Sequence, residues 1–257
     1  MHLYRGKPLN TSQIPELHVA LQTLAQRSGL KTTPELYYIP SSLINAFAVG
    51  RPRRSSIAIT DGLIRSLTLR EAVGVIAHEL SHIRNNDLRV MAIADIFTRL
   101  TSTLSLFGQV LLLLNLPLII TGEISINWFV IVLLIFAPLI STLAQLGLSR
   151  TREFDADLNA VQLTGDPEGL ASALIKIDYI QGNWLERLFL PGRRQTDPSL
   201  LRTHPLTEDR VQRLLQLKHS KNFSQPPEHT HSPLLPSGFV TEKITRPARW
   251  HISGLWH

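Results

Sequence analysis

Cysteine is absent from the 257-residue sequence. This absence excludes disulfide bonds, thiolate nucleophiles and cysteine-ligated zinc, so any metal ion must be held by histidine, aspartate or glutamate. The stretch Met1–Ile14 lacks an apolar segment of signal-peptide length, and we expect no secretion by cleavage. Dense basic runs interleaved with aromatics are also missing, although the formal net charge is +6. These features predict contact with anionic membrane lipids and no nucleic-acid partner.

Charged residues are missing from two long stretches in the middle of the chain. Between Arg99 and Glu123 lie 23 residues without a charge, and between Glu123 and Arg150 lie 26 more. A helix needs about 20 mostly apolar residues to cross the hydrocarbon core. The second stretch meets this requirement. Several polar residues and a proline interrupt the first, namely Ser102, Ser105, Gln109, Asn115 and Pro117.

We therefore predict a transmembrane helical hairpin over residues 99–149. Whether its first segment crosses the whole membrane stays open. The alternative is a hairpin buried in a soluble core. Arginines flank the hairpin on both sides, while its tip holds only Glu123. The positive-inside rule then places both flanks in the cytoplasm, as in a multi-pass protein of the cell inner membrane.

The segments outside the hairpin predict a mixed fold. Short strands punctuated by proline and glycine, expected at 35–39, 44–49 and 56–60, indicate a small sheet. Helices are expected from Pro15, after a capping box formed by Thr68 and Glu71, from Pro167 and from Thr207. The fold class is thus α+β and mostly helical. We expect one domain built from residues 1–98 and 150–218, and a mobile tail rich in proline, serine and histidine over 219–257.

The segment His78-Glu79-Leu80-Ser81-His82 is a His-Glu-x-x-His motif within a predicted helix. The spacing of four residues places both imidazoles on one face, where they can share one cation. Glu79 projects at an adjacent angle and can reach a water at the metal as a general base. The motif could also be an ordinary polar helix face. The surrounding residues are apolar, however, and ionisable groups in an apolar helix are costly unless they are paired or metal-bound.

A catalytic zinc usually takes three protein ligands, so a third ligand must come from elsewhere. The segment 152–157 follows the hairpin and returns beside the motif if the hairpin ends where it started. Glu153 and Asp157 are four residues apart and share a helix face. One can bind the metal while the other orients a histidine, and the spacing does not decide which. A solvated acidic cluster that balances the neighbouring arginines is the alternative.

These residues resemble the HtpX-like membrane zinc metallopeptidases, a family related to the CAAX prenyl endopeptidases. Four motifs carry the resemblance: Asn45-Ala46-Phe47-Ala48, His78 to His82 with Asn86-Asp87, Ser149 to Asp157, and His204-Pro205 with Arg210. The resemblance implies a zincin-type domain that binds one Zn²⁺ per chain, with Glu153 as the third ligand and Asp157 as its partner. It also implies that His204 and Arg210 face the reacting carbonyl. The N-terminal membrane segments common in the family are not found here.

The sequence therefore predicts a membrane-embedded zinc endopeptidase that cuts protein substrates at the cytoplasmic membrane face. The resemblance implies a role in membrane protein quality control. The strand from Asn45 to Ala48 could pair with an extended substrate through its backbone, or be an ordinary sheet strand. Two rival functions are a catalytically silent membrane scaffold and a processing peptidase with a single substrate. Retention of Glu79 argues against the scaffold, because a structural zinc site needs no base.

Overall fold

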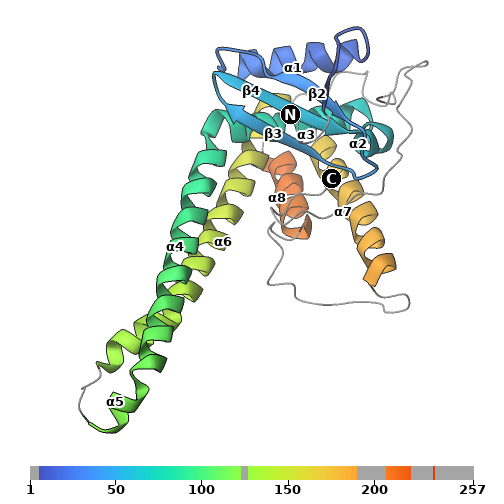
Figure 1. Cartoon of the computed structure of the whole chain (residues 1–257). Helices are drawn as coiled ribbons and strands as arrows, with labels where there is room; N and C mark the ends of the chain where they lie inside the picture. The colour runs from blue at the N-terminus through green and yellow to red at the C-terminus, as the bar shows by residue number, and fades with distance from the viewer. Residues whose placement is uncertain (1–5, 123–126, 190–206, 221–233, 235–257) are drawn as a thin grey trace. The chain divides into compact units, whose positions relative to one another are not determined.

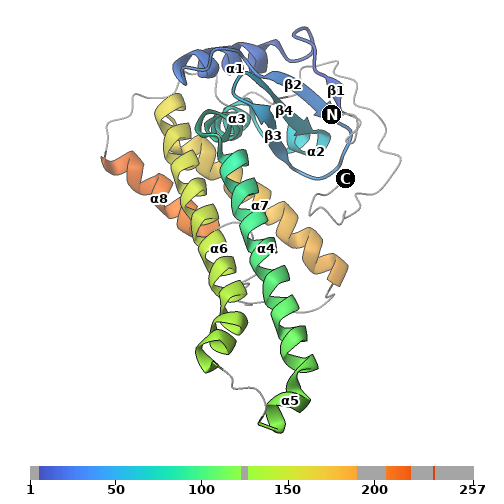
Figure 2. The ribbon, with the colours of Figure 1, turned by 60° about the vertical axis from the view of Figure 1, so that its left-hand side comes forward.

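The computed structural model describes residues 6–122, 127–189, 207–220 and 234, and it divides into two units. One unit contains the chain up to Asn86 and again from Glu153, and the other contains Asp87–Arg152. The first holds a four-stranded sheet and most of the helices, and the second holds a helical hairpin (Figures 1 and 2).

The sheet has the strand order β1-β2-β4-β3. Its strands are β1 (Lys7–Pro8), β2 (Glu35–Ile39), β3 (Ala46–Arg51) and β4 (Arg54–Thr60). β4 pairs in parallel with β2 and antiparallel with β3, and β1 pairs antiparallel with β2. The three longer strands were predicted to within two residues at each end. β1, which has only two residues, was not predicted. Among the described strands β3 lies at an edge, so one side of its backbone does not pair with another of these strands.

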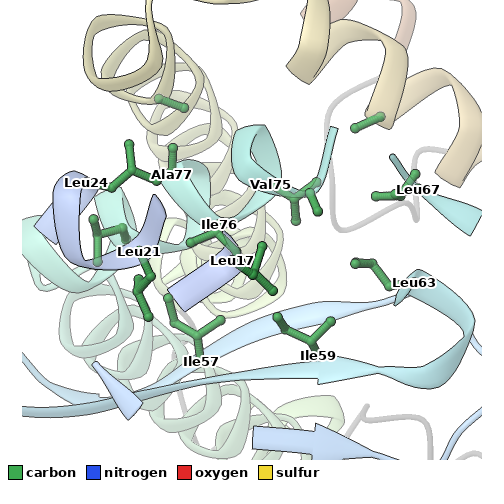
Figure 3. Close-up of a cluster of buried hydrophobic side chains, with 14 of the residues drawn as sticks. Leu17, Leu21, Leu24, Ile57, Ile59, Leu63, Leu67, Val75, Ile76 and Ala77 are labelled. Carbon is green, nitrogen blue, oxygen red and sulfur yellow. The ribbon is translucent and has the colours of Figure 1, made fainter. Parts of the chain in front are cut away.

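Two helices cover one face of the sheet with apolar side chains. α1 (Pro15–Arg27) and α3 (Leu69–Asn85) contribute Leu17, Leu21 and Ile76, which meet Ile57 and Ile59 of β4 (Figure 3). All five side chains are almost completely buried. Burial of a leucine or isoleucine stabilises the fold by about 1.5–3 kcal/mol, so this layer holds α3 firmly against the sheet.

The remaining elements of this unit surround α3. They are α2 (Asp61–Ser66), the end of α6 (Trp128–Thr164), α7 (Pro167–Phe189) and α8 (Thr207–Ser220). Glu71 fixes α3 to α7, because its carboxylate accepts hydrogen bonds from Ser172 and from Lys176. The same carboxylate accepts from the backbone N–H of Thr68, which confirms the predicted capping box.

The second unit contains α4 (Asp87–Leu114), the short α5 (Leu116–Ile120) and the first part of α6. α4 and α6 are both long and apolar enough to cross a membrane. Only 6% of the most apolar window of α4 and 0% of that of α6 is buried inside the protein. A hairpin in a soluble core would bury these side chains, so the observed exposure favours a lipid environment over the soluble alternative. The predicted hairpin, residues 99–149, is shorter than the observed unit, Asp87–Arg152.

A hydrogen bond joins the two long helices of this unit. Pro138 lies inside α6 and has no N–H, so the carbonyl of Leu134 lacks its donor within the helix. The hydroxyl of Ser105 on α4 donates to this carbonyl. Gly108 lies one turn further along α4, and a Cβ atom there would clash with the Leu134 side chain. Ser105, one of the polar residues that interrupt the first apolar stretch, thus provides the hydrogen-bond donor that Pro138 removes from the second.

Candidate active site

The three reactive residues of the motif lie on α3 within the first unit. His78 is buried, and His82 and Glu79 are partly buried. The Nε2 atoms of His78 and His82 lie 3.1 Å apart, as the four-residue spacing predicts. Both rings therefore point to one spot beside the helix.

The third member of this group comes from the end of α6. A carboxylate oxygen of Glu153 lies 3.5 Å from Nε2 of His78, and the other lies 3.8 Å from Nε2 of His82. One ligand atom from each residue falls within 4.8 Å of the other two. Two ligands on a tetrahedral zinc are separated by about 3.3 Å, given metal–ligand bonds of about 2.0–2.2 Å. The donor types and their separations therefore fit a small divalent cation.

The charges around this spot also fit a divalent cation. Three carboxylates converge here, from Glu79, Glu153 and Asp157, and the guanidinium of Arg210 ion-pairs with the last two. If the two imidazoles are neutral, these four side chains together carry a net charge of −2. Uncompensated charge is expensive in a buried site, and a divalent cation would balance it.

Asp157 connects a ligand to the rest of the unit. Its Oδ1 lies 2.9 Å from Nδ1 of His78, on the opposite side of the ring from Nε2. Arg210 on α8 donates to both oxygens of Asp157, each at 2.7 Å. Another nitrogen of the same guanidinium lies 3.0 Å from Glu153. Arg210 thus holds two acidic residues that are one turn apart on α6, and Asp157 in turn fixes the orientation of the His78 ring.

Burial and hydrogen bonds alter the acidities of these groups. Burial alone would raise the pKa of Asp157, but hydrogen bonds from Arg210 and His78 outweigh it and keep that pKa below its usual range. For His78, burial alone would lower the pKa, but the hydrogen bonds with Asp157 and Glu153 outweigh this effect and raise the pKa to about 10.

Glu79 contacts the edge strand of the sheet. One of its carboxylate oxygens accepts a hydrogen bond from the backbone N–H of Ala48 on β3, at 3.0 Å. Burial raises the pKa of Glu79, although His78 and His82 oppose this effect. A carboxylate with a raised pKa beside a metal site suits a general base.

The structure thus brings together most of the residues that the sequence singled out. His78, Glu79, His82, Glu153, Asp157, Arg210 and Ala48 all lie around one spot. Asn45 precedes β3, and its backbone is paired with Thr60 rather than directed to the free edge. His204 and most of the tail at 219–257 lie outside the described residues.

Two contacts were not predicted. The first is the contact of Arg210 with Asp157 and Glu153. The role of Arg210 at the reacting carbonyl stays a prediction. The second is the hydrogen bond from Ala48 to Glu79, which depends on the strand register. No sequence motif determines that register.

Comparisons with known proteins agree with this geometry. Residues 11–218 match the family described as Peptidase family M48. The chain belongs to peptidase family M48. A protease HtpX homolog from Acaryochloris marina is 38% identical over 240 residues, which cover 84% of this chain and 76% of the relative. A homolog from Acidiphilium cryptum is also 38% identical over 240 residues, with 86% and 79% covered.

A solved structure supports the fold. The crystal structure of S. mikatae Ste24p aligns with a TM-score of 0.51 at 22% identity, over 82% of this chain and 51% of that chain. The chain thus spans about half the length of that structure. The family resemblance and the mostly helical metallopeptidase fold with a small sheet are confirmed. This chain is a membrane metallopeptidase, and its substrates are proteins or peptides.

Proposed function

We propose that this chain is a zinc-dependent endopeptidase that hydrolyses extended segments of protein substrates at the cytoplasmic membrane face. The observation that carries the proposal is the convergence of His78, His82 and Glu153 beside Glu79, next to an edge strand. The positions of the flanking arginines support the cytoplasmic side. We also propose a role in membrane protein quality control, which the family resemblance and the two candidate spans support.

In this proposal His78, His82 and Glu153 hold zinc, and Asp157 and Arg210 position the ligands. A bound zinc ion would supply the Lewis acidity that makes a water acidic near neutral pH. Glu79 accepts the proton of the attacking water on its carboxylate and later delivers it to the leaving amine nitrogen. Its raised pKa favours the first step, because a stronger base accepts the proton of the water more readily.

The free edge of β3 would bind the substrate backbone. In the antiparallel pairing with β4, Asn45 exchanges hydrogen bonds with Thr60, so alternate residues of β3 direct their backbone groups away from β4. The N–H of Ala48 belongs to the outward set, because it reaches Glu79. A peptide that pairs with this edge would therefore lie next to the base. Backbone pairing is tolerant of sequence and would suit unfolded substrates.

His204 and Arg210 remain candidates for stabilising the oxyanion. Arg210 already donates to Asp157 and approaches Glu153, so we propose positioning of these acids as its main role.

The proposal can be tested with the full chain purified in detergent and loaded with zinc. An unfolded protein such as casein should be cut, and a chelator should abolish cleavage until zinc is restored. Glu79→Gln is the matched control for contaminating proteases, because the variant retains shape and metal but not the base. Equal cleavage by the two proteins would contradict the proposal.

A further inference from the structure

The hairpin between β3 and β4 carries a cluster of arginines. Arg51 pairs with Arg54 across the two strands, so Pro52 and Arg53 form a two-residue loop. Arg51, Arg53 and Arg54 are all exposed. Three positive charges within four residues form a strong local field, and this loop directly continues the strand that lies beside Glu79.

The loop has a defined conformation. Gly50 adopts a φ of 104°, and a Cβ atom there would lie 2.3 Å from the carbonyl oxygen of Arg54. Only glycine fits at this position. The hydroxyl of Thr32 donates to the carbonyl oxygens of Pro52 and Arg53, at 3.3 Å each. The arginines are therefore presented from a fixed backbone.

Two of these charges, those of Arg51 and Arg53, face the same question of which group could pair with them. Among the residues that the structure describes, neither Arg51 nor Arg53 lies within ion-pair distance of a carboxylate. Arg54 differs, because it lies near Tyr37, whose hydroxyl donates a hydrogen bond to Glu35. Arg51 and Arg53 thus remain available to a ligand.

The position of the cluster relative to the reactive centre identifies that ligand. Arg51 is three residues beyond Ala48 along β3, and a strand rises about 3.3 Å per residue. A peptide that pairs with the free edge of β3 at Ala48 therefore passes the arginines about three residues, or about 10 Å, from the cut bond. We propose that Arg51 and Arg53 select substrates with acidic side chains a few positions from the cut bond, on one side of it. This inference rests on the proposed function.

The test uses the zinc-loaded full chain in a neutral detergent and peptides that share one cleavable centre. One peptide carries glutamates on the N-terminal side, a second carries them on the C-terminal side, and a third carries glutamines in both places. One acidic peptide should show a kcat/KM about twofold to fivefold above the neutral peptide, the range that exposed ion pairs give. The preference should shrink in about 0.5 M salt, because exposed charges are screened.

Charge reversal provides the decisive comparison. Arg53→Glu should remove the preference while leaving kcat/KM for the neutral peptide unchanged. Combining it with Arg51→Glu should reverse the preference. Lys7→Glu is the matched control, because Lys7 is an exposed cation on β1, at the opposite edge of the same sheet. That variant should keep the full preference.

Three outcomes would overturn the inference. The first is equal cleavage of the acidic and neutral peptides by the unchanged chain, which would leave the arginines as charges that discourage edge-to-edge aggregation. The second is a preference that survives both reversals. The third is a loss of activity in Arg53→Glu that is equal for all peptides and needs phosphatidylglycerol vesicles, which would indicate a lipid contact. Cleavage of none of the peptides would instead contradict the proposed function.

Discussion

We propose that Glu153 binds the metal and that Asp157 orients His78. Three isosteric substitutions on one helix turn of α6 can test these two roles. Glu153→Gln and Asp157→Asn each remove one negative charge from the buried cluster while keeping side-chain shape. Asp155→Asn removes the same charge from an exposed position between them and serves as the matched control. If the acids acted only through charge, the first two variants would lose zinc equally.

The structure predicts unequal losses. Asp157 contacts Nδ1 of His78 and does not belong to the group of ligand atoms, so its amide can still accept from the ring. Loss of such an orienting partner costs about 10–100-fold in metal affinity, or about 1.4–2.7 kcal/mol. In the proposed site Glu153 supplies a ligand atom, and an amide oxygen is a poor substitute for a carboxylate. Its replacement should cost more than about 100-fold, beyond the range of an orienting partner.

The measurement is a competition for zinc between each purified variant and a chromophoric chelator, together with zinc per chain and cleavage of casein. We expect Asp155→Asn to match the unchanged chain, Asp157→Asn to bind more weakly and Glu153→Gln to be nearly metal-free. Tight binding by Glu153→Gln with a metal-free Asp157→Asn would show that the roles are exchanged. Normal binding by both would place the third ligand elsewhere, with His204 the first residue to examine.

Three further predictions follow. Glu79→Gln should keep stoichiometric zinc and lose about 10²–10⁴-fold in kcat, because the amide cannot accept the proton; near-normal turnover would refute the role of the base. A reporter inserted within residues 122–127 should score as extracytoplasmic and one at the C-terminus as cytoplasmic, whereas the same side for both would mean that the hairpin does not span. Ser105→Ala should destabilise the hairpin by about 0.6–1.7 kcal/mol in detergent unfolding. It should cost nothing in the Pro138→Ala background, where Leu134 regains its donor; an equal cost in both backgrounds would rule out the proposed pairing.

Local signals in the sequence were sufficient for most of the fold. The capping box at Thr68 and Glu71 marked the start of α3, and the helix begins at Leu69. Turn residues bounded β2 at both of its ends. These features depend on neighbours within a few residues, so the chain itself specifies them. β1 carried no such signal, because two residues that pair only with β2 form neither an alternating nor an apolar pattern.

The contacts that complete the site are of a different kind. Arg210 and Asp157 are 53 residues apart in the chain, and Ala48 and Glu79 are 31 apart. Helical spacing placed Asp157 on the same face as Glu153, but nothing local specifies which guanidinium reaches them across the fold. The contact of Ala48 depends on the strand register, and a shift of one residue would turn its N–H toward β4. The register is set by burial of Ile57 and Ile59 against α1 and α3, so the packing of the core determines which backbone group meets the base. The reactive residues can thus be identified from local sequence, whereas their positions relative to one another depend on how the core packs.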